Sequence, residues 1–181
     1  AVDGREAYLT CGCGVVFPVD AVGGTVRWAV RYQRDGKPNA MQRQMYGNQG
    51  PGLLELEGWD DDVVIPFGRD LVVMASDPDL LFALDRRTGK FRWSSPRTSP
   101  VGTVASYCVG VHGRGLIVAG KNVVRSIDML AEGKLMWEKE IEDSFGRGCV
   151  TEDSVYIPVK DSILQLDRAK GRELTQVGVA L

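Results

Sequence analysis

The residues most suited to chemistry in this 181-residue chain are four cysteines and a single histidine. Cys11 and Cys13 are separated by one glycine, which is neither the C-x-x-C spacing of zinc and redox sites nor an adjacent pair. Cys108 and Cys149 occupy similar places in consecutive predicted strands and could face each other. His112 ends a predicted strand without a Ser or Cys partner placed by the sequence. We therefore expect buried or half-buried thiols and a non-catalytic histidine.

Two further polar segments match ligand-binding motifs only in part. Asp60, Asp61 and Asp62 could offer oxygens to Ca²⁺, but they lack the spaced acidic pattern of a calcium loop. The glycine-rich segment 47–52 lacks the Gly-Lys-Ser/Thr that completes a phosphate loop. The sequence therefore predicts no catalytic residue, no metal site and no bound cofactor.

The composition is that of an ordinary globular protein, with 44% hydrophobic and 25% charged residues. The formal net charge is −2, so there is no basic excess to neutralise a phosphate backbone, and a nucleic acid is not expected as a partner. Apolar runs reach only about six residues, which is too short for a membrane span. The 22 glycines and the many β-branched residues predict an all-β protein rich in turns.

The elements that position these side chains follow a repeat that occurs four times, in segments 4–28, 68–93, 113–137 and 152–175. Each segment has an apolar strand, a short turn, a second apolar strand that ends in Asp, a glycine-bearing turn and a third strand. The repeated residues are Asp20, Asp85, Asp128 and Asp167, then Gly24, Gly89, Gly133 and Gly171, then Trp28, Trp93 and Trp137, with Thr175 in the fourth place. A strand-rich repeat of about 40 residues is typical of propeller blades.

The chemistry of the second repeat explains its residues. Asp85 can accept backbone N–H bonds and start the turn, and Gly89 can supply the positive φ that closes it. Trp93 places a large ring on the last strand, where it can pack between blades. Both faces of the strand at 80–84 are apolar, which predicts a sheet enclosed between neighbouring sheets.

The segment Ala83–Trp93 reads A-L-D-R-R-T-G-K-F-R-W and resembles the repeat of the pyrroloquinoline-quinone (PQQ)-like β-propeller family. The resemblance covers four blades and nearly the whole chain outside 34–60. It implies an all-β fold: a partial β-propeller of about four four-stranded antiparallel blades, the first one incomplete, from a seven- or eight-bladed ring. The expected parts of this single domain are blades at 1–33, 61–96, 104–141 and 147–181, with an insertion loop at 34–60.

The repeat also predicts the individual strands, together with one helical turn near 40–46. Strands are expected at 6–12, 14–20, 25–32, 63–67, 71–76, 80–85, 90–94, 107–112, 115–120, 123–128, 134–140, 148–151, 154–159, 162–167 and 172–177.

The resemblance has a consequence for activity as well. Quinoprotein dehydrogenases of this family hold PQQ with an adjacent Cys–Cys disulfide, a stacking Trp, and Ca²⁺ bound by acidic and amide side chains. Here Gly12 separates Cys11 from Cys13, and the tryptophans of the repeat stand at structural positions. We expect a non-enzymatic scaffold or protein-interaction module; the alternative is part of a PQQ-dependent quinoprotein oxidoreductase that binds PQQ with Ca²⁺. The family also implies a periplasmic or otherwise extracytoplasmic location.

A binding surface is predicted from strand direction, because alternating strands send the D-x-x-T-G turns to one end of the propeller. The opposite end receives Cys11, Cys13 and the loop 34–60, and long loops in compact folds often carry function. A surface insertion without a ligand is the other interpretation of that loop. The candidate surface residues are Tyr46, Asn48, Gln49, Trp59, Asp77 and Asp79.

The expected partner is a protein or the remaining blades of a longer chain. It should contact the candidate surface before it contacts Arg87 or Lys90, whose turn is already explained by turn chemistry. Open sheet edges also predict self-association.

Overall fold

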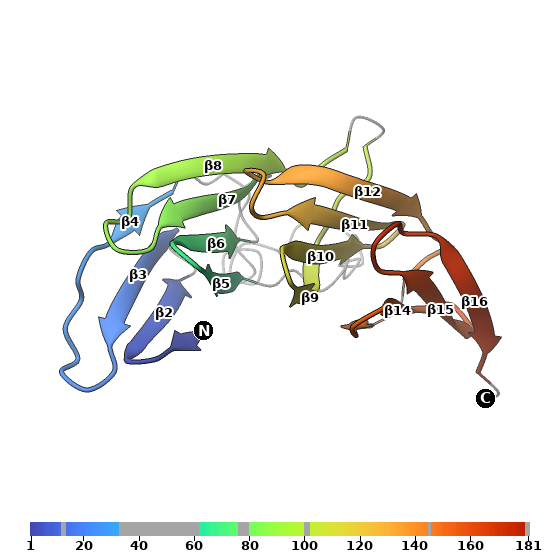
Figure 1. Cartoon of the computed structure of the whole chain (residues 1–181), viewed down its shortest axis with the longest axis horizontal. Helices are drawn as coiled ribbons and strands as arrows, with labels where there is room; N and C mark the ends of the chain where they lie inside the picture. The colour runs from blue at the N-terminus through green and yellow to red at the C-terminus, as the bar shows by residue number, and fades with distance from the viewer. Residues whose placement is uncertain (12–13, 33–61, 76–79, 100–101, 145, 180–181) are drawn as a thin grey trace, which may run out of the picture. The chain divides into compact units, whose positions relative to one another are not determined.

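The computed structural model describes residues 1–11, 14–32, 62–75, 80–99, 102–144 and 146–179. Within these ranges the regular structure is entirely β, with sixteen strands in four antiparallel four-stranded sheets (Figure 1). In each sheet the strands follow one another in chain order, so every sheet is a simple meander. This architecture confirms the all-β fold and the four predicted blades.

The first two sheets contain the strands up to residue 96. The first sheet is β1 (Val2–Asp3), β2 (Glu6–Cys11), β3 (Val15–Asp20) and β4 (Val30–Arg31). The second sheet is β5 (Val63–Phe67), β6 (Asp70–Met74), β7 (Leu80–Asp85) and β8 (Phe91–Pro96).

The last two sheets contain the strands from residue 107 onward. The third sheet is β9 (Tyr107–His112), β10 (Gly115–Gly120), β11 (Val123–Asp128) and β12 (Lys134–Glu140). The fourth sheet is β13 (Cys149–Val150), β14 (Ser154–Val159), β15 (Ser162–Asp167) and β16 (Glu173–Gly178).

Most strands begin and end within two residues of their predicted bounds, and two are shorter than predicted. The strand expected at 25–32 is reduced to β4 and an isolated bridge between Val19 and Val26, while the Trp28 ring between them lies against Gly89 of the second sheet. The strand expected at 148–151 is reduced to Cys149–Val150. The predicted helical turn at 40–46 lies outside the described residues.

The chain divides into two compact units, and the boundary falls within β8, after Trp93. The first unit contains the first two sheets, whose facing strands share a core of Tyr8, Val16, Val64, Leu71, Val73, Ala75, Phe82 and Leu84. The second unit contains the last two sheets, with a core of Tyr107, Ile117, Ala119, Val124, Trp137, Val155, Ile157, Val159, Leu164 and Leu166. That all four sheets form one domain stays a prediction.

Burial on both faces of the middle strands agrees with the enclosed sheets that the sequence predicts. All residues of β6, β10 and β11 are buried, including the polar ones. By contrast, all six residues of β16, the edge strand of the fourth sheet, are exposed. The repeat thus places its apolar residues inside each unit and directs its turns toward solvent.

Candidate functional site

The repeated aspartates build the turns between the third and fourth strands. Asp20 Oδ1 accepts the backbone N–H groups of Val22 at 2.9 Å and Gly23 at 2.7 Å. Asp85 Oδ1 accepts the Thr88 hydroxyl at 2.7 Å and the Thr88 N–H at 2.9 Å. The Gly23 N–H is the main cause of a lowered pKa at Asp20, and the Thr88 hydroxyl is the main cause at Asp85.

The same turn occurs in the last two sheets, with one variation. Asp167 Oδ1 accepts the Lys170 N–H at 2.7 Å, and Asp128 Oδ1 accepts the Leu130 N–H at 3.0 Å. The third turn has one additional residue before its glycine, and this insertion places Glu132 at a φ of 56°. Such a conformation is uncommon for a residue with a side chain.

Two of the repeated tryptophans join neighbouring sheets. Trp28 of the first sheet donates its indole N–H to the Arg86 carbonyl of the second sheet at 3.1 Å. Trp137 of the third sheet donates in the same way to the Arg168 carbonyl of the fourth sheet at 2.9 Å. Each ring lies directly against the glycine of the turn that it contacts, Gly89 or Gly171. The glycine therefore serves two purposes, a positive φ and space for an indole ring.

The third tryptophan bonds within its own sheet. Trp93 is 5% exposed and donates to Asp70 Oδ2 at 3.3 Å, and Arg92 pairs with Asp70 Oδ1 at 2.5 Å. Thr175, in the place of a fourth tryptophan, is exposed in β16. The indole N–H groups of Trp28, Trp93 and Trp137 are all engaged in holding the fold.

These contacts bear on PQQ, the cofactor that the family's name suggests. A PQQ site of this family uses a tryptophan ring that stacks on the cofactor. The rings of Trp28 and Trp137 already lie on backbone glycines, and Trp93 is buried against Asp70. Among the described residues, no three His, Cys, Asp or Glu side chains gather as a metal site. The described residues do not fit PQQ, and no reaction step is derived through it.

The remaining chemistry-bearing residues are dispersed over the sheets. Cys11 and Cys108 are half-buried, as predicted, whereas Cys149 is exposed. That difference arises because β13 is only two residues long and leaves its first residue uncovered. His112 is half-buried at the end of β9.

The predicted binding surface cannot be compared with the structure. Its residues Tyr46, Asn48, Gln49, Trp59, Asp77 and Asp79 lie outside the described residues, as does Cys13. A partner-binding role for the loop 34–60 therefore stays a prediction.

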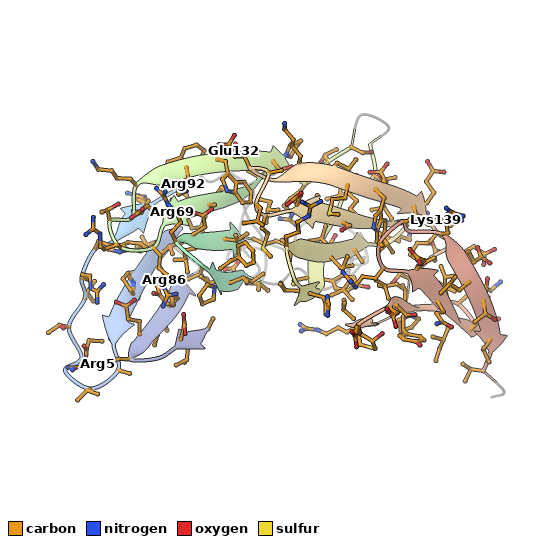
Figure 2. The ribbon with its side chains drawn as sticks, viewed as in Figure 1. Arg5, Arg69, Arg86, Arg92, Glu132 and Lys139 are labelled. Carbon is orange, nitrogen blue, oxygen red and sulfur yellow. The ribbon has the colours of Figure 1, made fainter. Side chains whose placement is uncertain are left out.

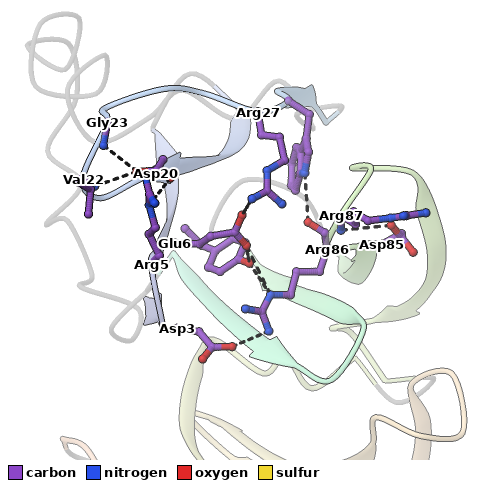
Figure 3. Close-up of polar contacts among 12 residues, drawn as sticks. Asp3, Arg5, Glu6, Asp20, Val22, Gly23, Arg27, Asp85, Arg86 and Arg87 are labelled. Carbon is purple, nitrogen blue, oxygen red and sulfur yellow. Dashed lines mark hydrogen bonds and ion pairs between the residues drawn. The ribbon is translucent and has the colours of Figure 1, made fainter.

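A pocket of about 310 Å³ opens at the turn end of the first unit, on the side where the sequence indicated only turn chemistry. Figure 3 shows the polar contacts of Glu6, Arg27 and Arg86, which belong to its lining. The first sheet contributes Glu6 and Arg27, and the second sheet contributes the remaining residues. The lining consists of Glu6, Arg27, Gly68, Arg69, Asp85, Arg86 and Arg87. Four guanidinium groups and two carboxylates thus line one opening.

The inner part of this pocket is a closed polar network. Glu6 forms an ion pair with Arg27 and accepts the Tyr8 hydroxyl, which in turn accepts a hydrogen bond from Arg86. Arg86 also pairs with Asp3 at 2.5 Å, and its guanidinium carbon lies 5.2 Å from the Tyr8 ring centre. Burial raises the pKa of Tyr8, and the hydrogen bond to Tyr8 raises the pKa of Arg86. These groups satisfy one another across the two sheets.

The outer part contains two arginines with spare donors. Arg69 is 73% exposed and lies 4.0 Å from Asp85, at the limit of an ion pair. Arg87 donates only its backbone N–H to Asp85, and its guanidinium has no ion-pair partner in the part of the chain that the structure describes. In Figure 3 the Arg87 side chain extends away from the network around Glu6.

The sequence contains one signal for this site, in the turn of the second sheet. The residue two places after the repeated Asp is Val22, Leu130 or Ala169 in the other sheets, and it is arginine only at Arg87. Because the turn accepts Val, Leu or Ala at this position, a charged residue there indicates a role other than forming the turn.

Four meander sheets of four strands each, joined by tryptophans that pack on glycine turns, define this protein as a partial β-propeller. It belongs to the PQQ-like family described as outer membrane protein assembly factor BamB, whose model matches residues 1–177.

Solved propellers share the fold at low sequence identity. BamB from Moraxella catarrhalis has a TM-score of 0.66 and 18% identity, over 97% of this chain and 49% of that chain. The quinohemoprotein alcohol dehydrogenase from Comamonas testosteroni has a TM-score of 0.66 and 14% identity, over 96% of this chain and 33% of that chain. The Pan2 WD40 domain from Neurospora crassa has a TM-score of 0.62 and 12% identity, over 97% and 47%.

The chain thus spans half or less of the length of these propellers. Curated protein sequences show no match to it. Over its described residues, the chain has no helix of the length and apolar character that a bilayer crossing needs.

Proposed function

We propose that this chain is a non-enzymatic propeller scaffold that binds a protein partner outside the cytoplasm. The observation that carries the proposal is the pocket at the turn end of the first unit, where Arg69 is held only by a 4.0 Å ion pair and the Arg87 guanidinium has no ion-pair partner among the described residues. The other polar and aromatic residues of the repeat are engaged in turns and in contacts between sheets.

Family membership supports the proposal. The family description names an outer membrane assembly factor, and an assembly factor acts through other proteins. The same membership supports an extracytoplasmic location. The partner is a separate protein or further blades of a longer chain, and the loop 34–60 with Tyr46, Asn48, Gln49 and Trp59 is a second proposed contact region.

A co-purification experiment with the full-length protein tests this function. We expect the tagged protein to retain one partner in a saturable, stoichiometric complex, and deletion of 37–52 to weaken that complex. A control replaces Lys160, a hairpin residue that belongs to neither proposed surface. If no protein forms a saturable complex with the tagged chain, the scaffold function is contradicted.

A thermal-shift measurement separates this function from the quinoprotein alternative. Addition of PQQ with Ca²⁺ should leave the melting temperature unchanged, because Trp28, Trp93 and Trp137 are committed to the fold. A rise of several degrees that depends on both additives would favour the oxidoreductase instead.

A further inference from the structure

The outer part of the pocket carries chemistry that the proposed function does not yet name. We propose that Arg69 and Arg87 bind the carboxylate side chains of an acidic segment of the protein partner. The inference rests on the proposed function and specifies the chemistry of the partner at this one site.

The first argument is the charge balance of the pocket. Glu6 is already engaged by Arg27 and by the Tyr8 hydroxyl, with Arg86 at 3.9 Å. Asp85 Oδ1 receives the Thr88 hydroxyl and two backbone N–H groups. Glu6 and Asp85 Oδ1 are therefore used internally, Arg69 reaches Asp85 Oδ2 only at 4.0 Å, and the Arg87 guanidinium has no ion-pair partner among the described residues.

The second argument comes from comparison with the other sheets. Arg5 in the first sheet and Arg114 in the third hold the position of Arg69, because the carbonyl of each accepts the backbone N–H of the residue after the repeated Asp. Arg5 pairs with Asp20 at 2.7 Å and Arg114 with Asp128 at 3.3 Å, whereas Arg69 is 4.0 Å from Asp85. The corresponding arginines thus serve their own turns, and Arg69 is held at the longest of the three distances. Figure 2 labels Arg5 and Arg69 among the side chains of the first unit.

The reason for this difference is local. The Thr88 hydroxyl is the largest of the influences that stabilise the charged form of Asp85, and within the described part of the chain no hydroxyl bonds Asp20 or Asp128 in that way. Asp85 is therefore well satisfied without a close arginine, and the Arg69 guanidinium can bind another acceptor. Because Ala169 stands in place of Arg87 in the fourth sheet, the turn needs no arginine there either.

Carboxylate fits these donors better than phosphate does. The planar guanidinium fork matches a carboxylate in a bidentate pair, and two such groups suit two acidic side chains of one segment. A phosphate dianion would concentrate two negative charges at one point near Glu6 and Asp85, whereas two carboxylates spread the same charge over two positions and meet less repulsion. A nucleic acid would need a long basic track, and the chain has a formal net charge of −2.

Fluorescence anisotropy with the full-length protein and a labelled peptide of consecutive glutamates tests the inference. The double variant Arg69→Gln/Arg87→Gln should bind the peptide about tenfold more weakly than the wild type. The matched control Arg5→Gln/Arg114→Gln removes the same charge from equivalent turns, and Arg5 and Arg114 are 64% and 58% exposed. The control should stay within about twofold of the wild type.

Folding is checked by the melting temperature of each variant, and Arg87→Ala provides a second variant because Ala169 is accepted at the equivalent position. Equal weakening in the test and control variants would overturn the inference, since it would show general electrostatic attraction. Tighter binding of inorganic phosphate than of the peptide, lost with the same double variant, would also overturn it and assign the site to a free anion.

The two proposals fail in different ways. If the co-purified partner binds the Arg69→Gln/Arg87→Gln variant as tightly as the wild type, the scaffold function stands and this inference is wrong. If glutamate peptide binding follows the predicted pattern but no partner forms a saturable complex, the proposed function is wrong and the anion chemistry stands.

Discussion

At the scale of single residues, two glycines of the repeat serve both the turn and the packing of neighbouring sheets. Gly89 and Gly171 have φ values of 70° and 66°, and each lies under the indole ring of the preceding sheet. A turn glycine is usually explained by φ alone. Here the absence of a side chain also lets one sheet approach the next, so a local turn residue becomes part of the contact between sheets.

We predict that Gly171→Ala destabilises the second unit by about 3 kcal/mol, because its Cβ would overlap the Trp137 ring in addition to the strained φ. Gly113→Ala is the matched control: its φ is 57°, and nothing lies within 4 Å of the added Cβ. The control should cost about 1 kcal/mol from backbone strain alone. Urea denaturation measures both, and equal losses would contradict the role of the indole contact.

At the scale of elements, buried arginines fix the connection between β8 and β9. Arg125 of β11 is 3% exposed, pairs with Glu138 of β12 at 2.5 Å, and donates to the carbonyl oxygens of Arg97 and Thr103. Arg97 donates its Nε–H to the Ala105 carbonyl at 2.9 Å. Hydrogen bonds from the buried Arg125 therefore hold this connection, whereas the shorter connections are held by their own turn residues.

We predict that Arg125→Met destabilises the second unit by about 3 kcal/mol, because the substitution removes a buried guanidinium that pairs with Glu138 and donates to the Arg97 and Thr103 carbonyl groups. The double variant Arg125→Met/Glu138→Met should recover part of that loss, since no uncompensated charge remains. Chemical denaturation of the wild type, Arg125→Met, Glu138→Met and the double variant gives the coupling between the two side chains. A double variant less stable than Arg125→Met would show that the carbonyl contacts, and not the ion pair, dominate.

At the scale of the whole molecule, the fourth sheet ends in an exposed edge strand. β16 is exposed along its length, with Leu174 at 54% and Val177 at 59% exposure. An exposed strand edge with apolar side chains is a template for pairing with another strand. Further blades of a longer chain or a second copy of this chain would satisfy it.

We predict that the chain self-associates and that Leu174→Lys/Val177→Lys reduces the apparent mass in light scattering, because charge on an edge strand opposes pairing. Replacement of Leu130, which is 70% exposed in a turn and not on an edge, controls for apolar exposure alone. A monomeric wild type over a wide concentration range would refute this prediction.

The sequence by itself determined the strands, the turns and the fold, because each depends on neighbours along the chain. Asp85, Thr88 and Gly89 specify a turn through contacts within a few residues, and two-sided apolar strands specify enclosed sheets. The exceptions, a short β4 and an exposed Cys149, occur where strand pairing ends early.

Only the tertiary structure decided which charged groups of the first unit remain available. The Trp28–Arg86 bond joins residues 58 positions apart, and the network of Glu6, Tyr8 and Arg86 spans two sheets. Arg5, Arg69 and Arg114 look equivalent in the sequence, yet their distances to the repeated aspartates are 2.7, 4.0 and 3.3 Å. Electrostatic pairing depends on such distances, which the order of residues does not contain.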